Sequence, residues 1–184
     1  MRRRGLSLAE TLLSVAIIAI LGGVLIMLYN SAYQAYYTGT THLALQQRAR
    51  TTMQRISLEL KNAIQPSESG QAVEAPGMGA TASEVVFNRP AASFEKFDPR
   101  APVYAKRRVR FSNRRVLLDD NGLGAIPEEL LGRDIEACEF KHVAANAVRV
   151  TLKLKGQIRG EEGVREVPYE IISDVQIPYY ALSR

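Results

Sequence analysis

Few residues in this 184-residue chain have types and spacing that suggest chemistry. Asp119, Asp120 and Asn121 present oxygen-bearing side chains in succession, and Glu128 and Glu129 follow closely. Oxygen ligands of this kind suit Ca²⁺, so Asp119, Asp120 and Asn121 form a weak candidate for a calcium site. Their spacing does not match an EF-hand loop, however, and Asp-Asp-Asn-Gly is typical of a turn. We therefore favour the turn and expect neither a bound metal nor a cofactor.

The residues that most often act in catalysis are sparse and scattered. His42 and His142 lie in unrelated segments, and neither has metal-ligand spacing with Cys138, the single cysteine. One cysteine cannot form an internal disulfide, and the alternating segment around Cys138 favours a small buried apolar residue over a functional thiol. No glycine-rich phosphate loop is recognisable. The sequence therefore predicts no catalytic residues and a protein that is not an enzyme.

The N-terminus carries the most informative pattern of the chain. Three arginines at positions 2–4 and Gly5 precede a short uncharged segment, Glu10 and the apolar run 11–29. A carboxylate at the edge of a membrane segment is costly, so we expect Glu10 to have a use there. The uncharged stretch 12–28 is about as long as a helix needs to cross the hydrocarbon core of a bilayer.

This order of arginines, glycine, spacer, glutamate and apolar run resembles the type III signal sequence of type IV pilins and of the pseudopilins of type II secretion. The resemblance implies that a prepilin peptidase cleaves after Gly5 and that the new N-terminal residue, Leu6, is N-methylated. It also implies that the Glu10 carboxylate meets the free amine of a neighbouring subunit during assembly. The family more often has Phe or Met at the position of Leu6, so this chain is a conservative variant.

An ordinary signal anchor or secretory signal peptide is the alternative. A secretory signal has a shorter apolar region than this one, so a membrane helix fits the run better. A plain anchor that carries a sensor domain stays possible, but it leaves Glu10 unexplained. In either case the leader arginines predict a cytoplasmic N-terminus and a domain on the outer side of the membrane.

The net charge of +5 suggests an anionic partner, but its distribution argues otherwise. The excess of basic residues lies in the leader and in residues 30–65, and residues 66–184 are neutral overall. The densest basic run after residue 65 comprises Lys106, Arg107, Arg108, Arg110, Arg114 and Arg115. This run could follow a phosphate backbone, form a solvated sheet face, or contact acidic neighbours in a fibre. The neutral head and the few nearby aromatic residues weigh against nucleic acid.

Apolar periodicity predicts one long helix that continues beyond the membrane. Leu45, Ala49, Met53, Ile56, Leu60 and Ile64 recur in steps of three and four, which marks one helical face. A helix over residues 7–64 would be roughly 85 Å long. Gly39 and the pair Gly22-Gly23 are expected soft points. The pair could supply local melting or allow close helix approach, and the sequence leaves both open.

Residues 66–82 read as a loop, and strand signals follow it. The expected strands are 84–88, 103–111, 115–118, 135–143, 147–155 and 164–175, with turns near Ser112-Asn113 and Ala145-Asn146 and an apolar C-terminal segment 177–182. The predicted architecture is α+β, with a long helix packed on an antiparallel β-sheet head. The predicted organisation is a leader at 1–5, a transmembrane and assembly helix at 6–29, its amphipathic continuation at 30–65, and a β-rich head at 66–184.

The segment 50–64 points to a subgroup of this family, because it resembles the corresponding helix segment of J-type minor pseudopilins. The resemblance implies a minor pseudopilin near the tip of a type II secretion pseudopilus that helps to initiate assembly and protein export. The K-type tip subunit typically lacks the glutamate, so Glu10 implies a position below the tip. The implied partners are other pseudopilins or pilins, a prepilin peptidase, an assembly platform with its ATPase, and the inner membrane. A minor type IV pilin for pilus assembly or DNA uptake is the alternative.

Overall fold

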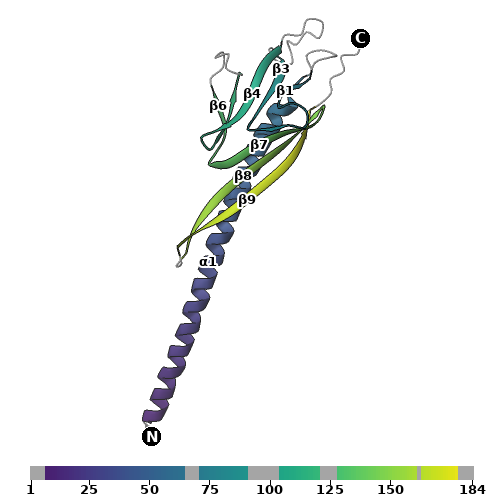
Figure 1. Cartoon of the computed structure of the whole chain (residues 1–184). Helices are drawn as coiled ribbons and strands as arrows, with labels where there is room; N and C mark the ends of the chain where they lie inside the picture. The colour runs from purple at the N-terminus through teal and green to yellow at the C-terminus, as the bar shows by residue number, and fades with distance from the viewer. Residues whose placement is uncertain (1–6, 65–70, 91–103, 121–127, 161–162, 178–184) are drawn as a thin grey trace.

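A computed structural model describes residues 7–64, 71–90, 104–120, 128–160 and 163–177 (Figure 1). One helix projects far from a β-rich head, and its N-terminal end lies at the tip of the projection. The elements in chain order are α1 (Leu8–Lys61), β1 (Val73–Ala75), β2 (Thr81–Ala82), β3 (Glu84–Pro90), β4 (Tyr104–Ser112), β5 (Arg115–Asp119), β6 (Glu129–Arg133), β7 (Ile135–Ala144), β8 (Ala147–Gly160) and β9 (Gly163–Gln176). The predicted α+β architecture is confirmed.

Helix α1 has 54 residues and is about 80 Å long at 1.5 Å per residue. It begins after Ser7 and is capped at its C-terminal end by Asn62, so it stops slightly before the predicted residue 64. The helix is continuous through Gly22, Gly23 and Gly39, although all three were expected to be soft points. A methyl group at any of these glycines would meet no atom within 4 Å. Close approach of another helix at Gly22-Gly23 is therefore sterically open.

The head consists of two antiparallel sheets rather than the single sheet that the sequence suggested. One sheet has the strand order β1-β3-β4-β5-β6, and the other has the order β2-β7-β8-β9. The predicted turn at Ala145-Asn146 joins β7 to β8, since Ala144 pairs with Ala147. The turn between β4 and β5 lies at Asn113-Arg114, one residue after the predicted position. Both residues there have positive φ (51° and 61°), which matches the right-handed twist of a two-residue hairpin.

Three strands were missed by the sequence analysis. The predicted loop 66–82 contains β1 and β2, which pair with the edges of the two sheets, and β6 lies at the far edge of the first sheet. These segments have two to five residues and little β-periodicity, so their structure depends on a partner strand that the local sequence does not reveal. Within the predicted C-terminal segment 177–182, Ile177 is buried, and the rest lies outside the described residues.

The head-proximal half of α1 supplies one side of the hydrophobic core. All six residues of the predicted helical face are buried, and Ile64 lies just beyond the helix end. They pack with apolar side chains from both sheets, including Phe87, Phe140 and Leu152. Thr52 is also buried, beside Gly132 of β6, where a side chain would clash with the threonine methyl group at 2.5 Å. The second half of α1 therefore fixes the head rigidly to the projecting first half.

Candidate functional site

The projecting half of α1 is the most unusual surface of the molecule. From Leu8 to Leu28 its large apolar side chains are exposed, and no part of its most apolar window is buried within the molecule. Monomeric soluble proteins rarely expose apolar surfaces of this extent, so such a surface marks a membrane or protein contact. The helix is long and apolar enough to cross a membrane.

The hydroxyl groups in this half are satisfied within the helix. Thr11 Oγ1 donates to the carbonyl oxygen of Leu8 at 2.8 Å, and Ser14 Oγ donates to that of Glu10 at 2.8 Å. A hydrocarbon environment provides no water to replace such partners, so a spanning helix must satisfy its polar groups internally. These two side chains are therefore compatible with a lipid or helix-packed environment.

Glu10 lies at the N-terminal end of α1 in a capping box. The Ser7 backbone N–H donates to Glu10 Oε2 at 2.8 Å, and the Glu10 backbone N–H donates to Ser7 Oγ at 3.3 Å. Two backbone donors that lack helical partners are thereby satisfied, and a carboxylate near a helix N-terminus also interacts favourably with the helix dipole. The Glu10 carboxylate therefore lies beside Ser7, the residue that immediately precedes the helix. The processing residues Gly5 and Leu6 lie outside the described residues.

Comparison with protein-family models, curated proteins and solved structures gives no significant match.

The basic run of the sequence does not form one continuous surface in the structure. Lys106, Arg108 and Arg110 alternate along β4, and each is bound by carboxylates. Lys106 Nζ lies 2.8 Å from Glu74, and Arg108 makes a bidentate contact with Asp119 at 2.9 and 3.0 Å. These contacts raise the pKa of the Arg108 guanidinium, chiefly through the hydrogen bond to Asp119. This face of the run is thus neutralised within the molecule.

Asp119 does not present a free carboxylate to a metal ion. Arg110 Nε also donates to Asp119 Oδ2 at 3.0 Å, so two guanidinium groups share one carboxylate, and Arg110 contacts Glu128 as well. The Asp119 side chain is only 9 % exposed. Among the described residues no group of three His, Cys, Asp or Glu side chains is placed to hold a metal. Asn121 lies outside the part of the chain that the structure describes.

Arg114 and Arg115 of the run gather with Arg133 near the β6 edge of the first sheet, whereas Arg107 lies in β4 opposite Phe87. Arg115 of β5 pairs in register with Arg133 of β6, and both line a hollow with Arg114 and Asp134. Like charges directly opposite on neighbouring strands destabilise the pairing. The sequence analysis missed this arrangement, because it depends on the register of a strand that was not predicted.

Cys138 and His142 have structural positions. Cys138 is buried in the core, and burial raises the pKa of its thiol, which disfavours the reactive thiolate. Its interpretation as a small buried apolar residue is confirmed. His142 is also buried, and its Nδ1 lies 3.2 Å from the Pro76 carbonyl oxygen. The His142 carbonyl oxygen accepts a hydrogen bond from the Gly79 N–H, and the His142 N–H donates to the Ala80 carbonyl oxygen. His142 in β7 therefore holds the segment that precedes β2.

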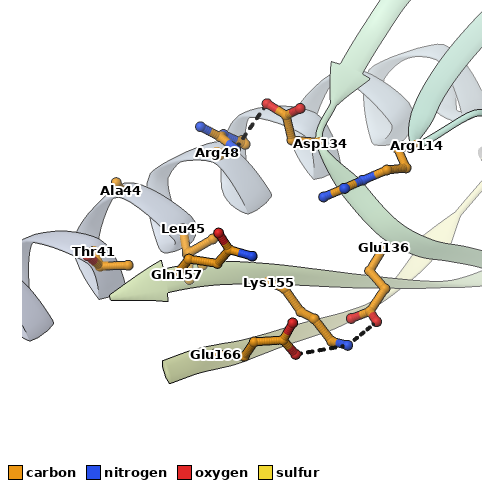
Figure 2. A pocket seen from close by; sticks show the side chains of 11 residues that line it. Thr41, Ala44, Leu45, Arg48, Arg114, Asp134, Glu136, Lys155, Gln157 and Glu166 are labelled. Carbon is orange, nitrogen blue, oxygen red and sulfur yellow. Dashed lines mark hydrogen bonds and ion pairs between the residues drawn. The ribbon is translucent and has the colours of Figure 1, made fainter. Parts of the chain in front are cut away.

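A pocket of about 670 Å³ lies between α1 and the second sheet (Figure 2). Most of its charged lining is paired internally. Arg48 lies 3.3 Å from Asp134, and Lys155 lies between Glu136 and Glu166 at 2.5 and 3.4 Å. These hydrogen bonds, first that to Glu136, raise the pKa of the Lys155 amine. The ion pair of Arg48 with Asp134 joins the helix to the head, so this arrangement supports a role in packing the helix against the sheets.

Proposed function

We propose that this chain is a minor pseudopilin of a type II secretion system, a structural subunit near the tip of a periplasmic pseudopilus. In this role the projecting half of α1 anchors the subunit in the inner membrane before assembly. It then packs against the helices of other subunits in the fibre. The head remains on the periplasmic side and contacts neighbouring heads, and no catalysis is involved.

The observation that carries the proposal is the exposed apolar half of a continuous helix whose other half is built into a folded head. Such a helix needs an apolar environment along its first half only, and both a bilayer and a bundle of similar helices supply one. The leader-like sequence before it and Glu10 at its start favour this role over a plain anchor, which leaves Glu10 unexplained. The open space around Gly22-Gly23 supports close helix packing in a fibre.

The proposal predicts a processed N-terminus. We expect a mature chain that starts at N-methylated Leu6, because Gly5 precedes the apolar run with Glu10 five residues later. Intact-mass measurement of the membrane-extracted protein from cells with an active prepilin peptidase tests this, with cells lacking the peptidase as the control. A chain that still begins at Met1 in the presence of the peptidase contradicts the proposal and favours a plain signal anchor.

A minor type IV pilin is the second candidate, since the same helix would serve a pilus. For a role in DNA uptake, the hollow lined by Arg114, Arg115 and Arg133 is the surface that favours it, because Arg108 and Arg110 of β4 are paired with carboxylates. Duplex DNA binding by the head would then weaken steeply with salt and would be lost on replacing Arg115 and Arg133 with glutamate. If the head does not bind duplex DNA even at low salt, a role in DNA uptake is excluded.

A further inference from the structure

The charge pattern of α1 does not define where the helix leaves a membrane. Between Glu10 and Arg48 the helix carries no Asp, Glu, Lys or Arg. That uncharged stretch is about 55 Å long at 1.5 Å per residue, whereas the hydrocarbon core of a bilayer is about 30 Å thick. Another feature must therefore set the depth of insertion and the height of the head.

Four tyrosines follow directly after the apolar run. Tyr29, Tyr33, Tyr36 and Tyr37 are 69, 49, 68 and 45 % exposed, and at these spacings they share one face of the helix. Their rings contact one another, with centroids 4.4 Å apart for Tyr33 and Tyr37 and 5.8 Å apart for Tyr36 and Tyr37. Tyrosine rings favour the interface between lipid and water, where the ring is apolar and the hydroxyl is hydrated. Tyr29 lies about 26 Å along the helix from Leu12, close to the thickness of the hydrocarbon core.

The hairpin of β8 and β9 reaches the same level on the helix. In Figure 1 this hairpin extends from the head along α1 toward its N-terminal end. Residues of its end, including Val164 and Arg165, line a hollow together with Gln34, Thr38 and His42 of the helix. Nearer the head, the close approach of β8 to α1 depends on Gly156, where a side chain would come within 2.7 Å of the Thr41 methyl group.

The hairpin and the tyrosines lie on different sides of the helix. At 100° per residue, the face that contains Gln34, Thr38 and His42 is roughly opposite the tyrosine face. Gln34 is five residues after Tyr29, or about 7.5 Å along the axis, and the headgroup layer on each side of the core is about 5–8 Å thick. The end of the hairpin therefore comes to the outer edge of the headgroup layer when Tyr29 is at its inner edge. Val164 is 61 % exposed there although it is apolar.

We propose that Tyr29 and Tyr33 lie in the headgroup layer of the membrane, with Tyr36 and Tyr37 just beyond it, and that Val164 and Arg165 of the β8–β9 hairpin rest on the lipid headgroups on the opposite side of the helix. Two contacts on opposite sides hold the head at a fixed height and limit the tilt of α1. This inference rests on the membrane-anchored state of the proposed function, and it adds the lipid surface as a contact of the head itself.

The absence of tryptophan from the chain allows a direct test. The full chain is reconstituted in vesicles of phosphatidylcholine and phosphatidylglycerol with a single tryptophan from Ile18→Trp, Tyr33→Trp, Val164→Trp or Ile172→Trp. Ile172 is the matched control for Val164, since it is 58 % exposed on the same face of β9, eight residues or about 26 Å farther from the hairpin end. Lipids brominated deep in the acyl chain and lipids with a headgroup quencher report the depth of each tryptophan. All four sites are exposed, and circular dichroism checks that each variant folds.

We expect the deep quencher to reduce emission from Ile18→Trp, and the headgroup quencher to reduce emission from Tyr33→Trp and Val164→Trp but not from Ile172→Trp. If Ile18→Trp escapes the deep quencher, the membrane span fails and the proposed function with it. If Ile18→Trp is quenched but Val164→Trp behaves like Ile172→Trp, only the hairpin contact is wrong. Deep quenching of Tyr33→Trp also overturns the inference. Quenching of Ile172→Trp overturns it as well, because a head that lies flat would bring both strand sites to the membrane.

Discussion

At the scale of single residues, carboxylates in this head act mainly as partners of arginine and lysine. Asp119 has the residue type of a calcium ligand, yet two guanidinium groups of β4 occupy its oxygens. The contacts are formed because Arg108 and Asp119 are cross-strand partners in the register of β4 and β5. Spacing along the chain is compatible with Asp119 as a calcium ligand and with Asp119 as a partner of arginine. Only the strand register decides between them.

This arrangement predicts a marked loss of stability for Asp119→Ala. The carboxylate is 9 % exposed and accepts several charge-assisted hydrogen bonds, so its removal should lower the free energy of unfolding by about 1.5–3 kcal/mol. Asp174→Ala is the matched control, since Asp174 makes a similar bidentate contact with Arg149 but is 50 % exposed. We expect a much smaller change there, because solvent screens exposed ion pairs. Equal losses in urea unfolding of the two variants would contradict the structural role of Asp119.

At the scale of elements, the sequence predicted the helix and the long strands better than the edges of the sheets. The helical face from Leu45 to Ile64 repeats a local pattern many times, and all of its residues are buried. Strands β1, β2 and β6 are short and pair only with distant segments, so their local sequence carries little signal. The exposed apolar helix half was readable from composition alone. Two other features could not be predicted from the sequence, because they depend on tertiary structure. They are the opposed pair Arg115 and Arg133 and the proximity of the β8–β9 hairpin to Gln34.

The packing of α1 on the head predicts opposite outcomes for two nearby substitutions. Ile56 is fully buried in the hydrophobic core, so Ile56→Ala should lower the free energy of unfolding by about 2–5 kcal/mol. Leu58, two residues later, is 62 % exposed, and Leu58→Ala should have little effect. The measurement is chemical unfolding of a truncated chain that begins at Ser31. If Ile56→Asp in the same chain left the thermal midpoint unchanged, the contact between helix and sheets would be wrong.

At the scale of the whole molecule, two environments are separated along one helix. The half inside the head is stabilised by burial in the molecule itself, whereas the projecting half needs a lipid or protein environment that the chain does not supply. Changes at the far end of the helix should therefore affect anchoring and assembly but leave the head folded. Glu10 lies about 57 Å along the axis from Arg48, which makes it a suitable position to test this separation.

We predict that Glu10→Ala keeps the protein in the membrane and reduces its incorporation into the fibre. The substitution removes a charge from the membrane boundary, so insertion should be at least as good. It also removes the proposed partner of a neighbouring subunit's N-terminal amine, together with the capping bond to the Ser7 N–H. Glu10→Gln separates these two effects, because glutamine can still cap the helix but carries no charge. The measurements are the amount of protein in isolated membranes and its recovery with partner subunits from sheared fibres.

If the charge acts in assembly, both variants are depleted from fibres at normal membrane levels. If Glu10→Gln assembles like the wild type and Glu10→Ala does not, Glu10 acts through the helix cap. If both assemble normally, the carboxylate has no part in subunit contacts, and the proposed role then depends on the processed N-terminus and the apolar helix alone.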